Sequence, residues 1–95
     1  MRGPNADQSS REDALKLIDE ALQMQPDHPE LLATRGEILL ALDRPRSAIV
    51  ALQRSFELDT LNLDTLTLLA DTQDQVGQDS SEVREIIRRI SLERR

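Results

Sequence analysis

The chain has 95 residues, with 12 Lys and Arg against 18 Asp and Glu, and its formal net charge is −6. An acidic chain repels the phosphate backbone of nucleic acids and anionic membrane surfaces, so we expect it to bind neither. With Phe56 as its single aromatic residue and no cysteine, the chain also lacks stacking platforms for bases and thiolate ligands for metals.

The first eight residues contain Gly3 and Pro4 and show no hydrophobic periodicity. We interpret residues 1–8 as a disordered lead-in and residues 9–95 as one helical domain. The lead-in has no apolar segment typical of a secretion signal, and no apolar run approaches the roughly 20 residues of a membrane helix. We therefore expect a cytoplasmic protein without a membrane span.

The first predicted helix begins at Ser9, a residue type that favours the N-cap, and ends before Pro26. Its apolar positions Ala14, Ile18 and Ala21 recur at helical spacing, so they lie on one side of the helix.

The second predicted helix begins at Asp27 and Glu30, which together form a capping-box pattern, and it continues to Leu42. Pro29 falls in its first turn, where the missing N–H of proline does no harm. Gly36 near its middle predicts a close approach of a neighbouring helix.

Three further helices are predicted over residues 45–58, 63–76 and about 80–93. Gly77 suits the C-terminal cap of the second of these three. The last helix carries an apolar stripe at the spacing i, i+3, i+4, i+7, formed by Val83, Ile86, Ile87 and Ile90. Because no segment alternates with a period of two, the sequence predicts an all-α fold of five helices.

Self-comparison reveals a repeat at an offset of 34 residues. Apolar trios align at this offset: Leu15, Ile49 and Val83; Ile18, Leu52 and Ile86; Leu22, Phe56 and Ile90. A period of this length, built from two helices, resembles the tetratricopeptide repeat (TPR). In the closest stretch, residues 32–59, the signature positions of that family hold Gly36, Leu39, Ala48, Leu52, Ser55 and Phe56.

The resemblance covers residues 10–92, about two and a half repeats, and implies antiparallel helix hairpins stacked as a short right-handed α-solenoid. The chain departs from the family pattern where bulky aromatics are common, at Leu32, Leu39, Leu66 and Gln73. It also departs at Glu82 and Arg89, where small residues are usual. We interpret the last helix as a C-terminal cap, because a terminal helix should be apolar on one side only.

No residue pattern indicates catalysis, a cofactor or a metal site. His28 is the only histidine, and we interpret it as a structural or surface residue beside a helix start. The carboxylates of Asp71, Asp74 and Asp79 lack the alternation of a calcium-binding loop. We therefore expect a protein that is not an enzyme.

Two helix faces are acidic and contain no lysine or arginine; we name them the acidic faces. They consist of Glu30, Ala33, Glu37 and Leu40 in the second helix and Asp64, Thr67, Asp71 and Asp74 in the fourth. By resemblance, these helices line the concave groove where such repeats bind extended peptides. Five carboxylates without a counter-cation favour a basic protein or peptide as ligand, and the alternative is a solvated polar surface.

The first helix offers a second candidate surface, because Ala14, Ile18 and Ala21 should pack on a preceding helix in a complete array. We expect this face to associate with a second copy or another partner, unless the chain is a fragment of a longer array. The sequence thus predicts a non-catalytic interaction or scaffold module. The alternative is a repeat appendage of a larger enzyme, such as a glycosyltransferase or sulfotransferase.

Overall fold

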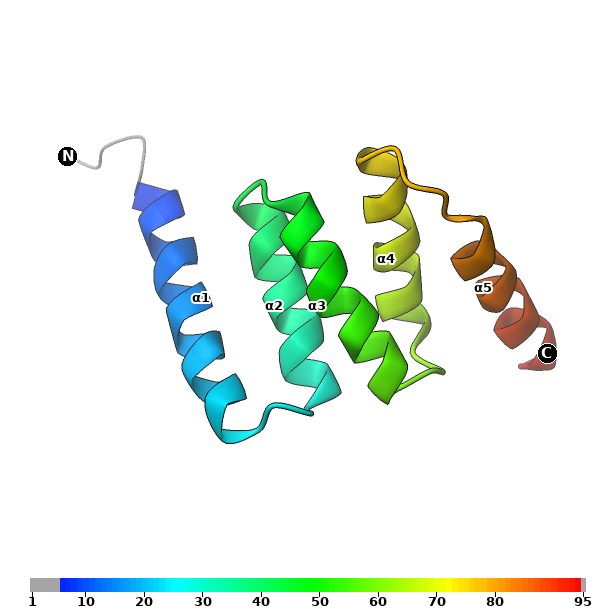
Figure 1. The fold of residues 1–95 in the computed structure, drawn as a ribbon, viewed down its shortest axis with the longest axis horizontal. Coiled ribbons are helices and arrows are strands. Elements are labelled where there is room, and N and C mark those ends of the chain that lie inside the picture. The colour runs from blue at the N-terminus through cyan, green and yellow to red at the C-terminus, as the bar shows by residue number, and fades with distance from the viewer. Residues whose placement is uncertain (1–5, 95) are drawn as a thin grey trace.

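The computed structural model describes residues 6–94 of the chain. Five α-helices follow one another in this range: α1 (Ala6–Met24), α2 (Pro29–Ala41), α3 (Pro45–Leu58), α4 (Leu63–Gln75) and α5 (Ser81–Glu93). They stand as a single row in chain order, and each helix packs against the next (Figure 1). Residues 6–94 contain no strand, so the predicted all-α helical repeat is confirmed.

Helix α1 begins at Ala6, three residues before the predicted start. Residues 6–8 are therefore helical, and Ser9 lies inside the helix, where it cannot act as the N-cap. Asp7 in the first turn favours this earlier start, because a negative charge stabilises the N-terminal end of the helix dipole. The rest of the predicted lead-in, residues 1–5, lies outside the described residues.

The N-cap of helix α2 lies one residue after Asp27, the cap that the sequence predicts. His28 is the N-cap, and its Nδ1 accepts a hydrogen bond from the N–H of Leu31 at 3.3 Å. Pro29 then takes the first helical position, for which its fixed φ is suited. The prediction of Asp27 as the cap is wrong for this reason, whereas the structural interpretation of His28 is confirmed.

The ends of α4 follow ordinary capping chemistry. The Oδ1 of Asn62 accepts a hydrogen bond from the N–H of Thr65 at 3.1 Å, which satisfies one free donor at the helix start. Gly77 follows the helix with φ of 77°, a conformation that costs glycine little, and the prediction for this end is confirmed.

The closest helix contact lies between α2 and α3, at Gly36. A Cβ atom added to Gly36 would lie 2.7 Å from both Cγ and Cδ2 of Leu52 and 3.5 Å from the carbonyl oxygen of Ala48. The hydroxyl of Ser55 donates a hydrogen bond to the carbonyl oxygen of Pro29 at 2.8 Å and joins the same two helices. The absence of a side chain at Gly36 therefore lets α2 and α3 pack closely, as predicted.

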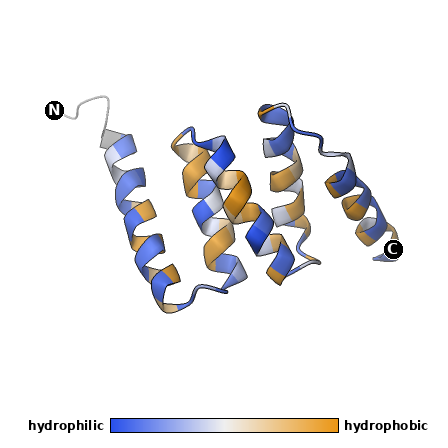
Figure 2. Cartoon of the chain, viewed as in Figure 1, coloured by the Kyte–Doolittle hydropathy of each residue, from blue (hydrophilic) through white to orange (hydrophobic). Residues whose placement is uncertain are grey.

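The hydrophobic core lies mainly between α3, α4 and α5. Its buried cluster consists of Ile49, Leu52, Leu66, Leu69, Ala70, Val83 and Ile90. Helix α1 contributes no buried residue over positions 7–24, and Figure 2 shows that polar residues cover much of this helix. Burial of side chains is therefore greatest in α3 and α4 and least in α1.

Helix α5 buries only one of the two sides that α3 buries. In α3, the side that contains Ala48 and Ser55 is buried, whereas the equivalent residues Glu82 and Arg89 of α5 are exposed. The buried residues of α5 are Val83 and Ile90, with Ile86 and Ile87 packed against the core cluster. Burial on one side only is the pattern that the sequence predicts for this helix.

One buried polar atom stands out in α4. The side-chain oxygen Oε1 of Gln73 is buried and has no hydrogen-bond partner among the described residues. Leu39 occupies the equivalent position of α2 and is 2% exposed. A desolvated acceptor without a partner destabilises the folded state, so Gln73 is a weak point of the packing.

We expect Gln73→Leu to raise the free energy of unfolding by about 1 kcal/mol, because it removes the unsatisfied acceptor and adds apolar contact. For a domain of this size, the melting temperature should rise by about 5 °C, which thermal unfolding followed by circular dichroism can measure. Gln75→Leu at the exposed end of the same helix is the control and should leave stability nearly unchanged. Equal melting temperatures for Gln73→Leu and the parent would contradict the assignment.

Candidate functional site

The acidic faces lie on α2 and α4, and most of their residues reach solvent. The exposed members are Glu30 and Glu37 of α2 and Asp64, Thr67, Asp71 and Asp74 of α4. Ala33 and Leu40 are half-buried, and Leu40 packs against the core cluster, to which α4 contributes Leu66 and Leu69. The apolar end of the α2 face is thus used for packing, while its two glutamates remain accessible.

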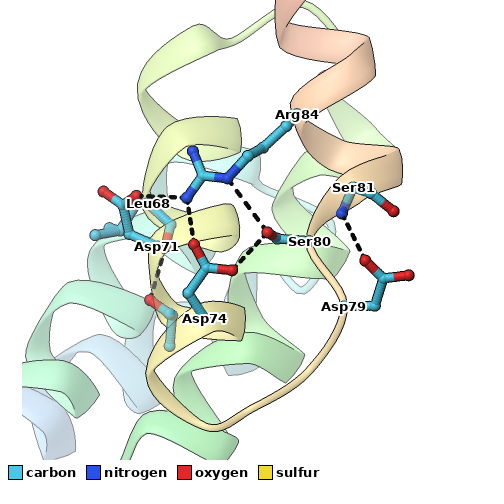
Figure 3. Close-up of polar contacts among 8 residues, drawn as sticks. Leu68, Asp71, Asp74, Asp79, Ser80, Ser81 and Arg84 are labelled. Atoms are coloured by element: carbon cyan, nitrogen blue, oxygen red, sulfur yellow. Dashed lines mark hydrogen bonds and ion pairs between the residues drawn. The ribbon is translucent and has the colours of Figure 1, made fainter.

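An arginine from α5 lies against the acidic face of α4, as Figure 3 shows. The Nη2 of Arg84 donates hydrogen bonds to Oδ1 of Asp71 at 3.1 Å and to Oδ2 of Asp74 at 2.5 Å. The Nε of Arg84 also donates to the hydroxyl of Ser80 at 3.2 Å, and that hydroxyl donates to Oδ1 of Asp74 at 2.5 Å. We name these four residues the Arg84 network.

The Arg84 network corrects one expectation from the sequence. The five carboxylates of the acidic faces were expected to lack a counter-cation, but Asp71 and Asp74 have one. The cation comes from a different helix, one turn beyond the loop that joins α4 to α5, so a search along α2 and α4 alone does not find it. Arg84 and Ser80 are therefore the residues that sequence reasoning missed here.

The same contacts shift the pKa values of Asp74 and Arg84. Hydrogen bonds from the hydroxyl of Ser80 and from Arg84 lower the pKa of Asp74. Hydrogen bonds to Asp74 and Asp71 raise the pKa of Arg84. The carboxylate of Asp74 is thus held in its charged form, with Arg84 as its counter-ion.

Three carboxylates of the acidic faces have neither an ion pair nor a side-chain hydrogen bond within residues 6–94: Glu30, Glu37 and Asp64. Glu30 lies in the first turn of α2, and Asp64 in the first turn of α4. Asp64 also lines a shallow surface hollow together with Leu61 and Arg94, where the guanidinium of Arg94 donates to the carbonyl oxygen of Leu61 at 2.9 Å. These three side chains are available to a cationic ligand.

The candidate association face on α1 is arranged differently from the prediction. Ala14, Ile18 and Ala21 are all half-buried, whereas Leu17 and Met24 are 66% and 84% exposed. The spacing of Ala14, Leu17, Ala21 and Met24 places them along one side of the helix. The 34-residue offset could have identified Leu17, because it aligns with Ala51, which is buried in α3.

Two ion pairs join helix α1 to the rest of the row, in addition to the packing of α1 on α2. Arg35 of α2 contacts Asp19 at 2.6 Å, and Arg44 at the start of α3 contacts Glu12 at 2.5 Å. The side chains of both pairs are 30% to 44% exposed, so water weakens these attractions. Helix α1 is therefore held by half-exposed ion pairs and half-buried apolar side chains, without a buried residue over positions 7–24.

The described residues contain no group of three or more His, Cys, Asp and Glu that could hold a metal ion. A search of the same residues for a helix long and apolar enough to cross a membrane finds none. His28, the only histidine of the chain, is engaged as a helix cap. The surfaces of these helices can therefore bind a partner through charged and apolar side chains.

Comparison with known proteins places the chain among helical repeats. The family model of the tetratricopeptide repeat matches residues 6–60. Anaphase-promoting complex subunit 7 of Dictyostelium discoideum is 40% identical over 47 residues, which make up 50% of this chain and 8% of that protein. Protein O-mannosyl-transferase TMTC3 of Homo sapiens is 37% identical over 59 residues, which make up 62% of this chain and 6% of that protein.

The matched segments are small parts of these relatives, so the chain spans less than a tenth of the length of either protein. The similarity to both lies in helical-repeat sequence, although one relative is by name a subunit of a complex and the other a transferase.

Proposed function

Because the chain belongs to the tetratricopeptide repeat family, we propose that it is a non-catalytic module that binds a basic, extended segment of another protein along the acidic faces of α2 and α4. The observation that carries this proposal is the set of exposed carboxylates without ion pairs, Glu30, Glu37 and Asp64. The negative charge of these carboxylates attracts the cationic side chains of lysine and arginine in a ligand.

Electrostatic attraction of this kind acts mainly on the rate of association and on specificity. The net charge of −6 adds a long-range field of the same sign, which attracts a cationic segment before contact. Since the carboxylates are exposed, added salt screens them and should weaken binding.

The test uses a short peptide of alternating arginine and serine as the ligand. We expect the triple variant Glu30→Gln, Glu37→Gln and Asp64→Asn to bind this peptide about ten-fold more weakly, because three exposed charge pairs are lost. Fluorescence anisotropy of a labelled peptide at low and at physiological salt measures both the affinity and its salt dependence.

A matched control separates the acidic faces from the overall charge. The triple variant Asp13→Asn, Glu20→Gln and Glu57→Gln removes the same number of exposed carboxylates at positions outside the acidic faces. If both triple variants weaken binding equally, net charge alone accounts for the attraction. The proposal then fails, and the acidic faces are solvated surfaces.

A second candidate function is self-association through α1, favoured by the exposed Leu17 and Met24. In α3, the side equivalent to this one is covered by α2, as the contacts at Gly36 and Ser55 establish. Covering an apolar side of this kind with another helix is favourable, because it removes apolar surface from water. A second copy of the chain can supply that helix.

We expect Leu17→Glu to shift the chain towards monomer, because a charge on this side of α1 cannot be buried without a partner. Sedimentation velocity at increasing concentration measures the effect. Leu61→Glu is the control, since Leu61 is 60% exposed and lies in the turn before α4. A wild-type chain that stays monomeric at high concentration would refute self-association.

The chain matches only a short repeat segment of each relative, so a role as one part of a larger protein is compatible with the comparisons. As an appendage of a larger enzyme, including a glycosyltransferase or sulfotransferase, the module would serve the same binding role and leave the chemistry to another domain. The proposal for the acidic faces is unchanged in that setting.

A further inference from the structure

Helix α5 covers part of the surface to which the proposed ligand would bind. Arg84 places one guanidinium between Asp71 and Asp74, at 3.1 Å and 2.5 Å from their carboxylate oxygens. Figure 3 shows the guanidinium lying directly on α4, with Ser80 bonded to both Arg84 and Asp74. A basic ligand that approaches this end of α4 meets carboxylates that are already occupied.

We propose that α5 is autoinhibitory, and we name it the strap. Arg84 of the strap occupies the place of a ligand cation, and a basic ligand must displace Arg84 to bind Asp71 and Asp74 on α4. This inference rests on the proposed function and concerns the regulation of the same site. Arginine suits this role because its planar fork can bond two carboxylates at once, which a lysine ammonium does less well.

The strap can be displaced because its polar contacts are exposed. The side chain of Arg84 is 46% exposed, and those of Asp71 and Asp74 are 62% and 52% exposed. Exposed pairs of this kind contribute little to stability, so a competing cation can exchange with Arg84 without unfolding the row. The loop between Gln75 and Ser81 gives α5 a connection that contains Gly77 and no helical residue.

The apolar contacts of α5 oppose full release. Val83 and Ile90 are buried against the core cluster, and their exposure to water would be unfavourable. The expected motion is therefore a loss of the Arg84 contacts at the side-chain level, with both Val83 and Ile90 still packed.

The test compares two arginine variants of α5 that change the net charge equally. Arg84→Gln frees Asp71 and Asp74, whereas Arg88→Gln leaves them paired, because Arg88 bonds Glu85 on its own helix at 2.9 Å and 2.7 Å. Hydrogen bonds from Arg88 and Arg89 lower the pKa of Glu85 to about 2, so Glu85 is charged in the parent. The ligand is again the arginine–serine peptide.

We expect Arg84→Gln to bind the peptide about three-fold more tightly than Arg88→Gln, a gain typical of releasing exposed ion pairs. Ser80→Ala removes the hydroxyl that holds Asp74 and Arg84 together, and it changes no charge. It should also strengthen binding, and it keeps the test decisive if Arg84→Gln lowers the helical content measured by circular dichroism.

The outcomes separate the strap from the proposed function. Equal affinity of Arg84→Gln and Arg88→Gln, together with unchanged affinity of Ser80→Ala, would overturn the strap while the basic-ligand function stands. If the parent and all three variants fail to bind the peptide, the proposed function fails, and the strap falls with it because it has no ligand to exclude. Tighter binding by Arg84→Gln and by Ser80→Ala supports the strap.

Discussion

Replacement of Gly36 by leucine is expected to lower the free energy of unfolding by about 3 kcal/mol, at the upper end of the usual cost of overpacking. The first added carbon alone would lie 2.7 Å from Leu52, which is 0% exposed, so Leu52 or the helix backbone must shift. For a domain of this size, the melting temperature should fall by about 15 °C. Thermal or urea unfolding followed by circular dichroism measures the change.

The control for this variant is Ala41→Leu, which introduces the same side chain at an exposed position of the same helix. It should change the free energy of unfolding by less than about 0.5 kcal/mol, as surface substitutions usually do. If Gly36→Leu melts at the temperature of the parent, the close packing of α2 on α3 is wrong.

Truncation of Leu69 is expected to have a comparable effect, because Leu69 is 1% exposed and belongs to the core cluster of α3, α4 and α5. Leu69→Ala leaves a cavity and should cost about 3 kcal/mol of unfolding free energy. Leu17→Ala in α1 removes the same atoms from a side chain that is 66% exposed, and it should cost almost nothing.

The comparison between these two leucines tests the uneven distribution of the core. Urea unfolding of both variants gives the free energies directly. Native-state hydrogen exchange should in addition show earlier opening of α1 than of α4, because α1 has no buried residue over positions 7–24. Equal costs for Leu69→Ala and Leu17→Ala would contradict this account of the core.

Most of the fold could be predicted from the sequence because the 34-residue repeat and the helical spacing of apolar residues are both local signals. Gly36 and Gly77 each have one physical role, close approach and positive φ, and both were recognisable as such. The helix starts were less predictable. A proline at the first helical position moves the cap of α2 from Asp27 to His28, and competition of this kind cannot be resolved from spacing alone.

The candidate site could be predicted only in part. Periodicity places Asp71 and Asp74 on one side of α4, but it does not show which residue of another helix reaches them. The position of Arg84 depends on how α5 is turned, and α5 packs through Val83 and Ile90 because Glu82 and Arg89 replace the small residues found in α3. The ion pair therefore follows from tertiary packing.

In the proposed function, a basic segment of another protein binds along the acidic faces of α2 and α4. Titration of the isotopically labelled chain with the arginine–serine peptide, followed through the backbone amide resonances, locates the contact surface directly. We expect the largest shifts around Glu30, Glu37 and Asp64, with smaller changes around Arg84 as its contacts with α4 are lost. Shifts confined to α1, or no shifts at low salt, would contradict the proposed function.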